Sequence, residues 1–118
     1  MKTQIWVILC DYRDPSQEIE HQTMMVDMMV KDLSNLTITT IAEEAERTLA
    51  DARAIHTNFF KVIGVSDPLL RLFTIPPPLT QAGRIQLKSI LADQVTSPIM
   101  EKDYELLFDK LDQIRSSK

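Results

Sequence analysis

Residues 64–80 read GVSDPLLRLFTIPPPLT, and this stretch holds four of the six prolines in the chain. Pro68 comes directly before the apolar run LLRLFTI, and the prolines at 76–78 follow that run directly. Because proline has no backbone N–H to donate, it is found at the ends of strands and at sheet edges. The pattern therefore predicts a strand over 69–75. Gly64 can end the helix that precedes it in a left-handed turn.

The first segment, QIWVILCDY at 4–12, is a continuous apolar run that is bounded by the charged turn RDPS. Its length and flanks are typical of a strand that is buried on both faces. Such a strand needs partners for its backbone N–H and C=O groups. The segment LTITTI at 36–41 and the run at 69–75 are the candidates.

Two helices are expected between these strands. Ser16 is a candidate N-cap for the first, and its apolar residues repeat at helical spacing as far as Leu33. The second follows a capping box formed by Thr40 and Glu43, in which each side chain satisfies a backbone N–H of the other residue. Its apolar face is expected to carry Ala45, Leu49, Ala52, Phe59 and Ile63.

Two more helices are expected after the last strand. The third begins near Thr80, and the fourth begins at Ser97 as its cap with Pro98 at the first helical position. The fourth has the clearest amphipathic stripe in the chain, formed by Met100, Tyr104, Leu107, Phe108, Leu111 and Ile114.

Strands that alternate with helices imply parallel pairing and an α/β sheet. The chain is long enough for a single domain with its own core. We expect a βαβαβ(β)α core over residues 1–95 and a C-terminal helical extension over 96–118.

The segment IGVSDPLLRLF resembles the part of thioredoxin-fold proteins in which a glycine precedes a proline that begins the third strand. In that fold the proline follows a cis peptide bond, and the resemblance makes Pro68 this structural cis-proline. The later segment LTQAGRIQLKSILADQV looks like the end of the same fold. The resemblance therefore implies a thioredoxin-like core.

Within that superfamily the chain is most similar to the KaiB-like domains of cyanobacterial clocks, including the sensor domain of the kinase SasA. The similar segments are VILCDYRDPSQE and LLRLFTIPPPLTQAG, with the triple proline Pro76, Pro77 and Pro78, and the resemblance covers roughly residues 4–95. The chain departs from the pattern at Asp67, where threonine is usual. Its second helix is also longer, and 97–118 add a helix.

Composition excludes several classes of function. The net charge of −4, without a basic stripe, argues against sequence-independent binding to nucleic acid. The longest apolar run, IWVIL, is too short to cross a bilayer, and the first residues lack a signal-peptide cleavage site. With Cys10 as the lone cysteine, neither an internal disulfide nor a CxxC pair can form. We expect a cytoplasmic protein that does not bind membranes.

Thioredoxin chemistry needs a reactive thiolate at the start of the first helix. The corresponding turn here, RDPSQE, contains no cysteine, and Cys10 lies in a strand where a buried, inert thiol is expected. The sequence therefore predicts a protein without dithiol redox activity.

Asp11 and Asp14 follow the first strand, at the end of a sheet where α/β proteins commonly bind ligands. Two carboxylates there could hold Mg²⁺, although no third acidic ligand follows the other strands. His21 and His56 do not have the spacing of a ligand set, and His56 is expected to be a packing residue. We expect no catalytic residues, no metal and no cofactor.

A binding role fits the chain better than catalysis. We expect a non-catalytic module that binds and regulates another protein. The alternatives are a small enzyme or metal-binding domain that uses Asp11 and Asp14, and a structural subunit of a larger complex. The C-terminal helix could dock on its own sheet or form a homodimer. The candidate partner-binding residues are Met24, Met28, Pro76, Pro77, Pro78, Tyr104, Phe108 and Leu111.

Overall fold

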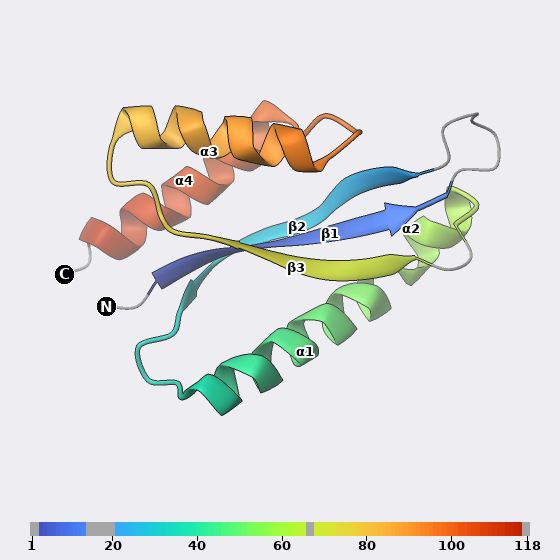
Figure 1. Ribbon diagram of the computed structural model, residues 1–118, viewed down its shortest axis with the longest axis horizontal. Helices are drawn as coiled ribbons and strands as arrows, with labels where there is room; N and C mark the ends of the chain where they lie inside the picture. Colours follow the sequence, from blue (N-terminus) through green and yellow to red (C-terminus); the bar gives the residue numbers. More distant parts are fainter. Residues whose placement is uncertain (1–2, 14–20, 66–67, 117–118) are drawn as a thin grey trace.

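The computed structural model describes residues 3–13, 21–65 and 68–116. Within them the chain has a mixed α/β fold, shown in Figure 1. The elements are, in order, β1 (Thr3–Tyr12), β2 (Gln22–Asp32), α1 (Ile38–Ile55), α2 (Thr57–Val62), β3 (Leu69–Ile75), α3 (Gln81–Gln94) and α4 (Glu101–Ser116). The three strands form one sheet in the order β2-β1-β3, and both pairings are antiparallel.

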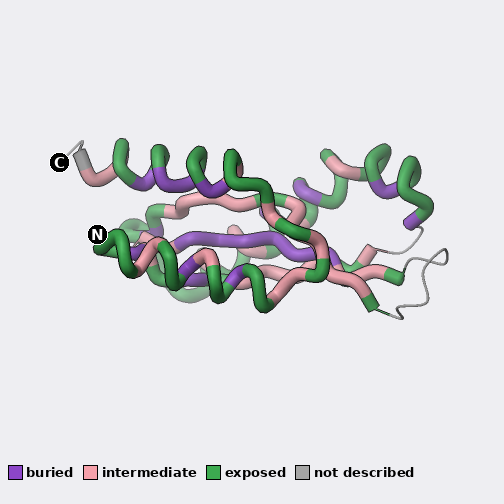
Figure 2. The backbone as a smooth tube through the Cα atoms, turned by 90° about the horizontal axis from the view of Figure 1, so that it is seen from above, coloured by how far each residue is buried: buried purple, intermediate pink, exposed green. Residues whose placement is uncertain are grey.

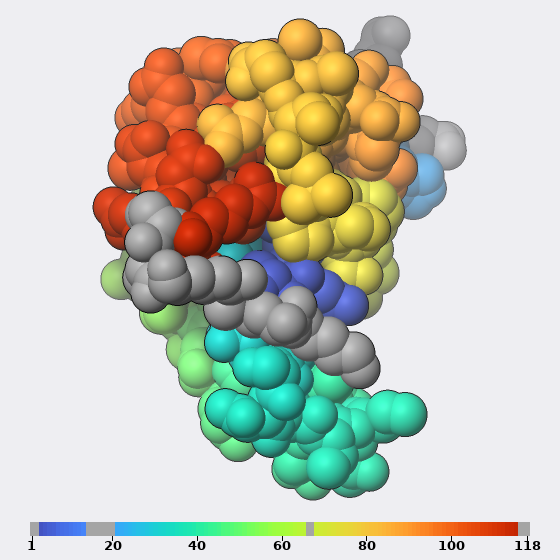
Figure 3. Space-filling model, turned by 90° about the vertical axis from the view of Figure 1, so that its left-hand side faces the viewer, coloured from blue at the N-terminus to red at the C-terminus, as the bar shows by residue number. Residues whose placement is uncertain are grey.

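The central strand β1 is the most buried element, and Figure 2 shows it enclosed between β2 and β3. Successive side chains of a strand point to opposite faces, so β1 serves two cores. One face joins Ile5, Val7 and Leu9 to α3 and α4 in the larger apolar cluster. The other face turns Cys10 toward Phe60 of α2 in a smaller cluster. Figure 3 shows the helical layers on either side of the strands.

The helix predicted to run from Ser16 to Leu33 is wrong: residues 22–32 form the strand β2, and 14–20 lie outside the described residues. The apolar residues of this segment come in two triplets, at 24–26 and 28–30, and this pattern is compatible with either element. The buried strand β1 decides between them, because its backbone needs a partner along its whole length. The next segment in the chain provides one as an antiparallel hairpin.

The strand predicted at 36–41 is also wrong, because α1 begins at Ile38. Thr37 is its N-cap: its Oγ1 accepts from the N–H of Thr40, 3.2 Å away, and Thr40 Oγ1 accepts from the N–H of Thr37 over 2.7 Å. The capping box therefore lies three residues earlier than the predicted one. As a result the order is β-β-α-α-β-α-α with antiparallel pairing, in place of the expected β-α-β order with parallel pairing.

Several predicted elements are confirmed. The strand over 69–75 is β3, and Gly64 ends the preceding helical segment with φ 78°, in the left-handed region. Thr80 caps α3, with its Oγ1 accepting from the N–H of Gly83 over 3.0 Å. The peptide bond between Asp67 and Pro68 lies outside the described residues.

The last helix, α4, packs on the sheet of its own chain. It begins at Glu101 rather than at Pro98, and Met100 is exposed. Four residues of the predicted apolar stripe are buried and Ile114 is half-buried, with the rings of Tyr104 and Phe108 stacked at 6.4 Å between their centroids. One apolar cluster thus contains residues from both sides of position 95. Among the described residues, none of the helices is long and apolar enough to cross a membrane.

Candidate functional site

The thiol of Cys10 is buried and stays protonated at neutral pH. It lies on β1 with no solvent exposure, against Phe60 and Val65. Burial raises its pKa to about 11, and the negative charge of Asp11 adds to this, while Arg53 opposes it. The thiolate, which is the nucleophilic form, is therefore almost absent at pH 7.

The carboxylate of Asp11 is held by two neighbouring strands. Its Oδ1 accepts from Thr23 Oγ1 of β2 over 2.6 Å, and its Oδ2 accepts from Arg71 Nε of β3 over 2.8 Å. Partial burial alone would raise the pKa of Asp11, but the hydrogen bonds from Thr23 and Arg71 and the charge of Arg71 outweigh it, so the pKa lies below its usual value. These contacts tie the three strands together.

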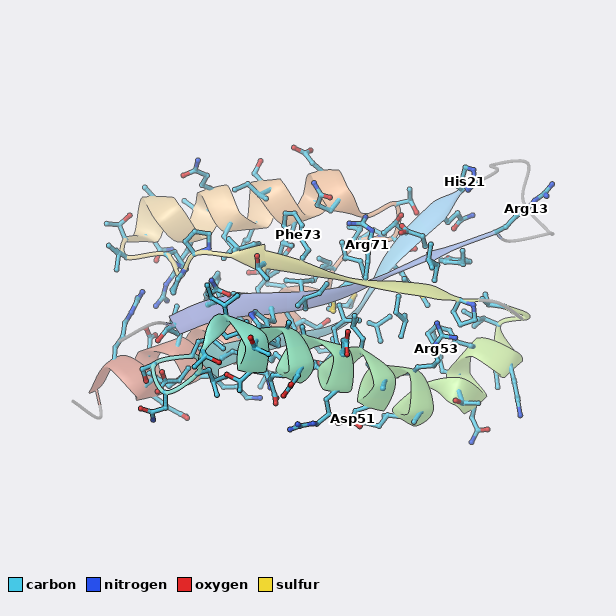
Figure 4. All side chains as sticks on the ribbon, turned by 60° about the horizontal axis from the view of Figure 1, so that its bottom comes forward. Arg13, His21, Asp51, Arg53, Arg71 and Phe73 are labelled. Carbon is cyan, nitrogen blue, oxygen red and sulfur yellow. The ribbon has the colours of Figure 1, made fainter. Side chains whose placement is uncertain are left out.

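The described part of the chain brings no cluster of metal ligands to the site suggested for magnesium. Asp14 falls outside the described residues, and within the described ranges no three His, Cys, Asp or Glu residues are grouped as metal ligands. Figure 4 shows His21 and Arg13 together at the distal end of the hairpin, apart from Arg53 and Arg71. His56 is half-buried and its ring lies 6.5 Å from that of Phe60, as expected for a packing residue.

The predicted partner-binding residues do not form one surface. Met24 and Met28 are both half-buried on β2, but Met24 packs on the smaller cluster and Met28 on the larger one. Of the three prolines only Pro76 is exposed, and the carbonyl of Pro78 accepts a hydrogen bond from Arg115. The three aromatic and leucine candidates from the last helix, Tyr104, Phe108 and Leu111, are buried in the core.

A different set of apolar side chains is exposed. Ile55, Phe59 and Val62 follow one side of the α1–α2 segment, and we call them the α1–α2 stripe. The hydrogen-bond ladder continues through the boundary at His56, whose N–H donates to Ala52 and whose C=O accepts from Phe60. The two helices therefore act as one rod with a slight break, and the stripe stays on one side of it.

The stripe lies on the side of the rod that faces β2. Lys31 of β2 reaches Glu44 of α1 with its Nζ over 3.0 Å, which marks this side of the helix. Ile55 lies about three helical turns further along the same side. On the opposite side Arg53 donates to the carbonyl of Pro68, next to β3, over 3.2 Å.

The face of the sheet next to the stripe is only half covered. Figure 1 shows α3 and α4 together on one face and α1 without a second long helix on the other. Helix α1 packs mainly against β3. The apolar side chains that β2 turns to this face, which are Met24, Val26 and Met29, therefore remain half-exposed.

A groove of about 280 Å³ runs along β2 on the other side of the sheet. Its walls are the strand residues Met25 and Met28 and, from α4, Leu106 and Lys110. Met28, which the sequence suggested as a binding residue, thus lines a concave surface at the outer strand of the sheet.

The sequence pattern did not reveal the stripe, because Phe59 was expected on the buried face of its helix. A wide apolar arc on the segment 55–63 was the available signal, since more positions are apolar there than one helix can bury.

Compared with known proteins, the chain matches no family model, no curated protein and no solved structure.

Proposed function

We propose that this chain is a non-catalytic, redox-inactive module that binds another protein through the α1–α2 stripe. The observation that carries the proposal is the exposure of Ile55, Phe59 and Val62 beside a half-covered sheet face. Val62 is 84% exposed and Ile55 is 75% exposed. Adjacent apolar side chains of this size on a soluble protein commonly mark an interaction surface.

The size of the surface supports this reading. A compact monomer of 13.5 kDa exposes about 6,500 Å². This chain exposes 7826 Å², and its radius of gyration of 15.4 Å exceeds the value of about 13.5 Å for a compact domain of its length. The excess of about 1,300 Å² is larger than the roughly 800 Å² that one protein contributes to a standard interface.

The chemistry of the single thiol supports a binding role over a redox role. The buried Cys10 is protonated at neutral pH because its pKa is raised to about 11. The proposal rests on these features and not on the likeness to thioredoxin-like or KaiB-like proteins. A structural subunit of a larger complex would use the same surface. It would differ from a regulatory module in forming a complex with a longer lifetime.

A matched pair of variants tests the proposal. Val62→Ser removes the most exposed side chain of the stripe, and Leu79→Ser removes a side chain of nearly equal exposure, 86%, before α3. Both proteins and the wild type are immobilised and exposed to an extract of the source cells. We expect a protein that the wild type and Leu79→Ser retain and that Val62→Ser loses.

Retention that is the same for all three proteins would contradict the proposal. Hydrogen exchange on the isolated complex provides a second check, because backbone amides near 55–63 should become protected. A complex that survives long washing at fixed stoichiometry would favour the structural subunit, and rapid exchange would favour the regulatory module.

A further inference from the structure

The outer strand β2 has a free edge along most of its length. In the described part of the chain it pairs with β1 alone. Near its start the edge is covered from outside: the C=O of Thr23 accepts from the N–H of Thr96 over 2.8 Å, and the N–H of Thr23 donates to Thr96 Oγ1 over 3.0 Å. Further along, the N–H of Met28 donates to the carboxylate of its neighbour Asp27. An outer strand with unpaired backbone groups is a template for another strand.

The register shows which residues present their backbone to this edge. In an antiparallel ladder the N–H and C=O of one residue point the same way, and the direction alternates along the strand. Thr23 lies opposite Asp11 and points outward, as its contacts with Thr96 show. Beyond the bulge at 26, Met28 and Val30 lie opposite Val7 and Ile5, so they also point outward.

The side chains on this stretch carry opposite charges four residues apart. Asp27, Met29 and Lys31 lie opposite Ile8, Trp6 and Gln4, on the face of the sheet that α1 covers in part. Asp27 is exposed, and one of its oxygens accepts from the N–H of Met28 over 2.8 Å. Lys31 contacts Glu44 and lies 5.3 Å above the Trp6 ring, and its ammonium group has further N–H donors.

We propose that β2 pairs with β2 of a second copy of this chain, antiparallel and with a two-fold axis at Met29. Met28 then lies opposite Val30 of the second copy, and the two outward-pointing residues exchange backbone hydrogen bonds. The N–H of Met28 gives up its contact with Asp27 Oδ1 for the C=O of that Val30, which also releases the carboxylate. Asp27 lies opposite Lys31 of the second copy, and the symmetry repeats both pairs.

Charge selects this register over its neighbours. An axis at Asp27 would place two aspartates face to face, and an axis at Lys31 would place two lysines face to face, and like charges opposite each other are destabilising. An axis halfway between two residues would oppose an outward-pointing residue to an inward-pointing one. An axis at Met28 or Val30 also matches the backbone directions, but it leaves Asp27 and Lys31 opposite apolar residues. Among these registers the axis at Met29 matches the backbone and also places the opposite charges together.

The dimer forms one six-stranded sheet. An axis perpendicular to the sheet keeps equivalent faces together, so both α1–α2 stripes lie on the same side of the assembly. The groove between Met28 and Leu106 lies next to the added strand and gives its apolar side chains a wall to pack on. The dimer interface is separate from Val62 and does not depend on the proposed partner.

Charge reversal with recombination tests the pairing. Asp27→Lys and Lys31→Glu each place like charges opposite one another in the homodimer, and we expect each to raise its dissociation constant at least about tenfold. Mixed in equal amounts, the two variants restore opposite charges at every pair, so a heterodimer should form with the affinity of the wild type. Sedimentation velocity across a concentration series measures the dissociation constants of the two variant homodimers and of the heterodimer.

The controls change net charge equally at other exposed positions, with Asp51→Lys on α1 and Lys102→Glu on α4. Both should dimerise like the wild type, and circular dichroism checks that every variant is folded. A wild type that is monomeric at high micromolar concentration would overturn the proposal, as would variants that dimerise unchanged or fail to recombine. Val62→Ser should lose its partner protein and remain a dimer, which separates this inference from the proposed function.

Discussion

Arg71 on β3 donates from its Nε to Oδ2 of Asp11 on β1, over 2.8 Å, and so links the central strand to its neighbour through side chains as well as backbone. Both side chains are partly exposed, at 41% and 32%, so the pair is screened by solvent. We expect Asp11→Asn to lower the free energy of unfolding by about 0.5–1 kcal/mol at neutral pH. Urea denaturation measures this.

The pH dependence of that loss is fixed by the direction of the pKa shift. The pKa of Asp11 is lower in the folded chain than its ordinary value of 3.8, so its contribution is present above that value and is lost as pH falls through the folded pKa. The difference between wild type and Asp11→Asn should therefore shrink below about pH 4. An equal effect of Asp51→Asn, at an exposed position, would show that the Arg71 contact is not the cause.

Cys10 should be unreactive in the folded protein. Its pKa of about 11 and its burial predict that a thiol reagent labels it only after unfolding. Because the folded pKa is raised, the stabilisation is complete below the unfolded value of 9.0 and is lost as pH rises through about 11. Wild type should lose stability relative to Cys10→Ala over that range. Insulin reduction that depends on Cys10 would contradict the non-redox assignment.

Two leucines of α4 test whether this helix belongs to the core. Leu111 is 1% exposed and Leu106 is 59% exposed on the same helix. Leu111→Ala should destabilise by about 2–4 kcal/mol, because it leaves a cavity where a fully buried side chain was. Leu106→Ala should cost less than about 0.5 kcal/mol. Similar small effects at both positions would mean that α4 is not needed for the stability of the core.

Gly64 should resist replacement for a purely backbone reason. Its φ is 78°, and a Cβ built on it has no atom within 4 Å. Gly64→Ala should therefore cost about 1 kcal/mol through strain in the left-handed region, without any steric clash. Gly64→Asn should cost less, because asparagine tolerates that region better. Thermal unfolding of the two variants compares them, and a neutral Gly64→Ala would contradict the predicted strain.

Much of the local structure could be predicted from the chain itself. The strand β3 between Pro68 and the prolines at 76–78, the left-handed Gly64 and the cap at Thr80 each depend on a residue type with one strong backbone preference. The buried stripe of α4 was equally clear, since its apolar residues repeat at helical spacing over four turns.

The segment 22–32 could not be predicted in the same way. Methionine and valine in two triplets fit a helix or a strand, and the choice depends on β1, a strand that needs a partner on each side. Because residues 22–32 form β2, the segment that follows is free to form α1 in place of the predicted strand at 36–41. The same pairing brings Thr23 and Arg71, from the two flanking strands, to the carboxylate of Asp11.

By itself the sequence determined that this is a mixed α/β chain with a single cysteine and therefore without an internal disulfide or a CxxC pair, because composition and local backbone preferences do not depend on partners far along the chain. Tertiary structure alone decided which apolar residues are left outside. Phe59 and Tyr104 both lie on amphipathic helices, yet Tyr104 is buried while Phe59 is half-exposed. The physical reason is that two helices cover one face of the sheet and only one long helix covers the other, and helical periodicity cannot specify how much surface a neighbouring element will cover.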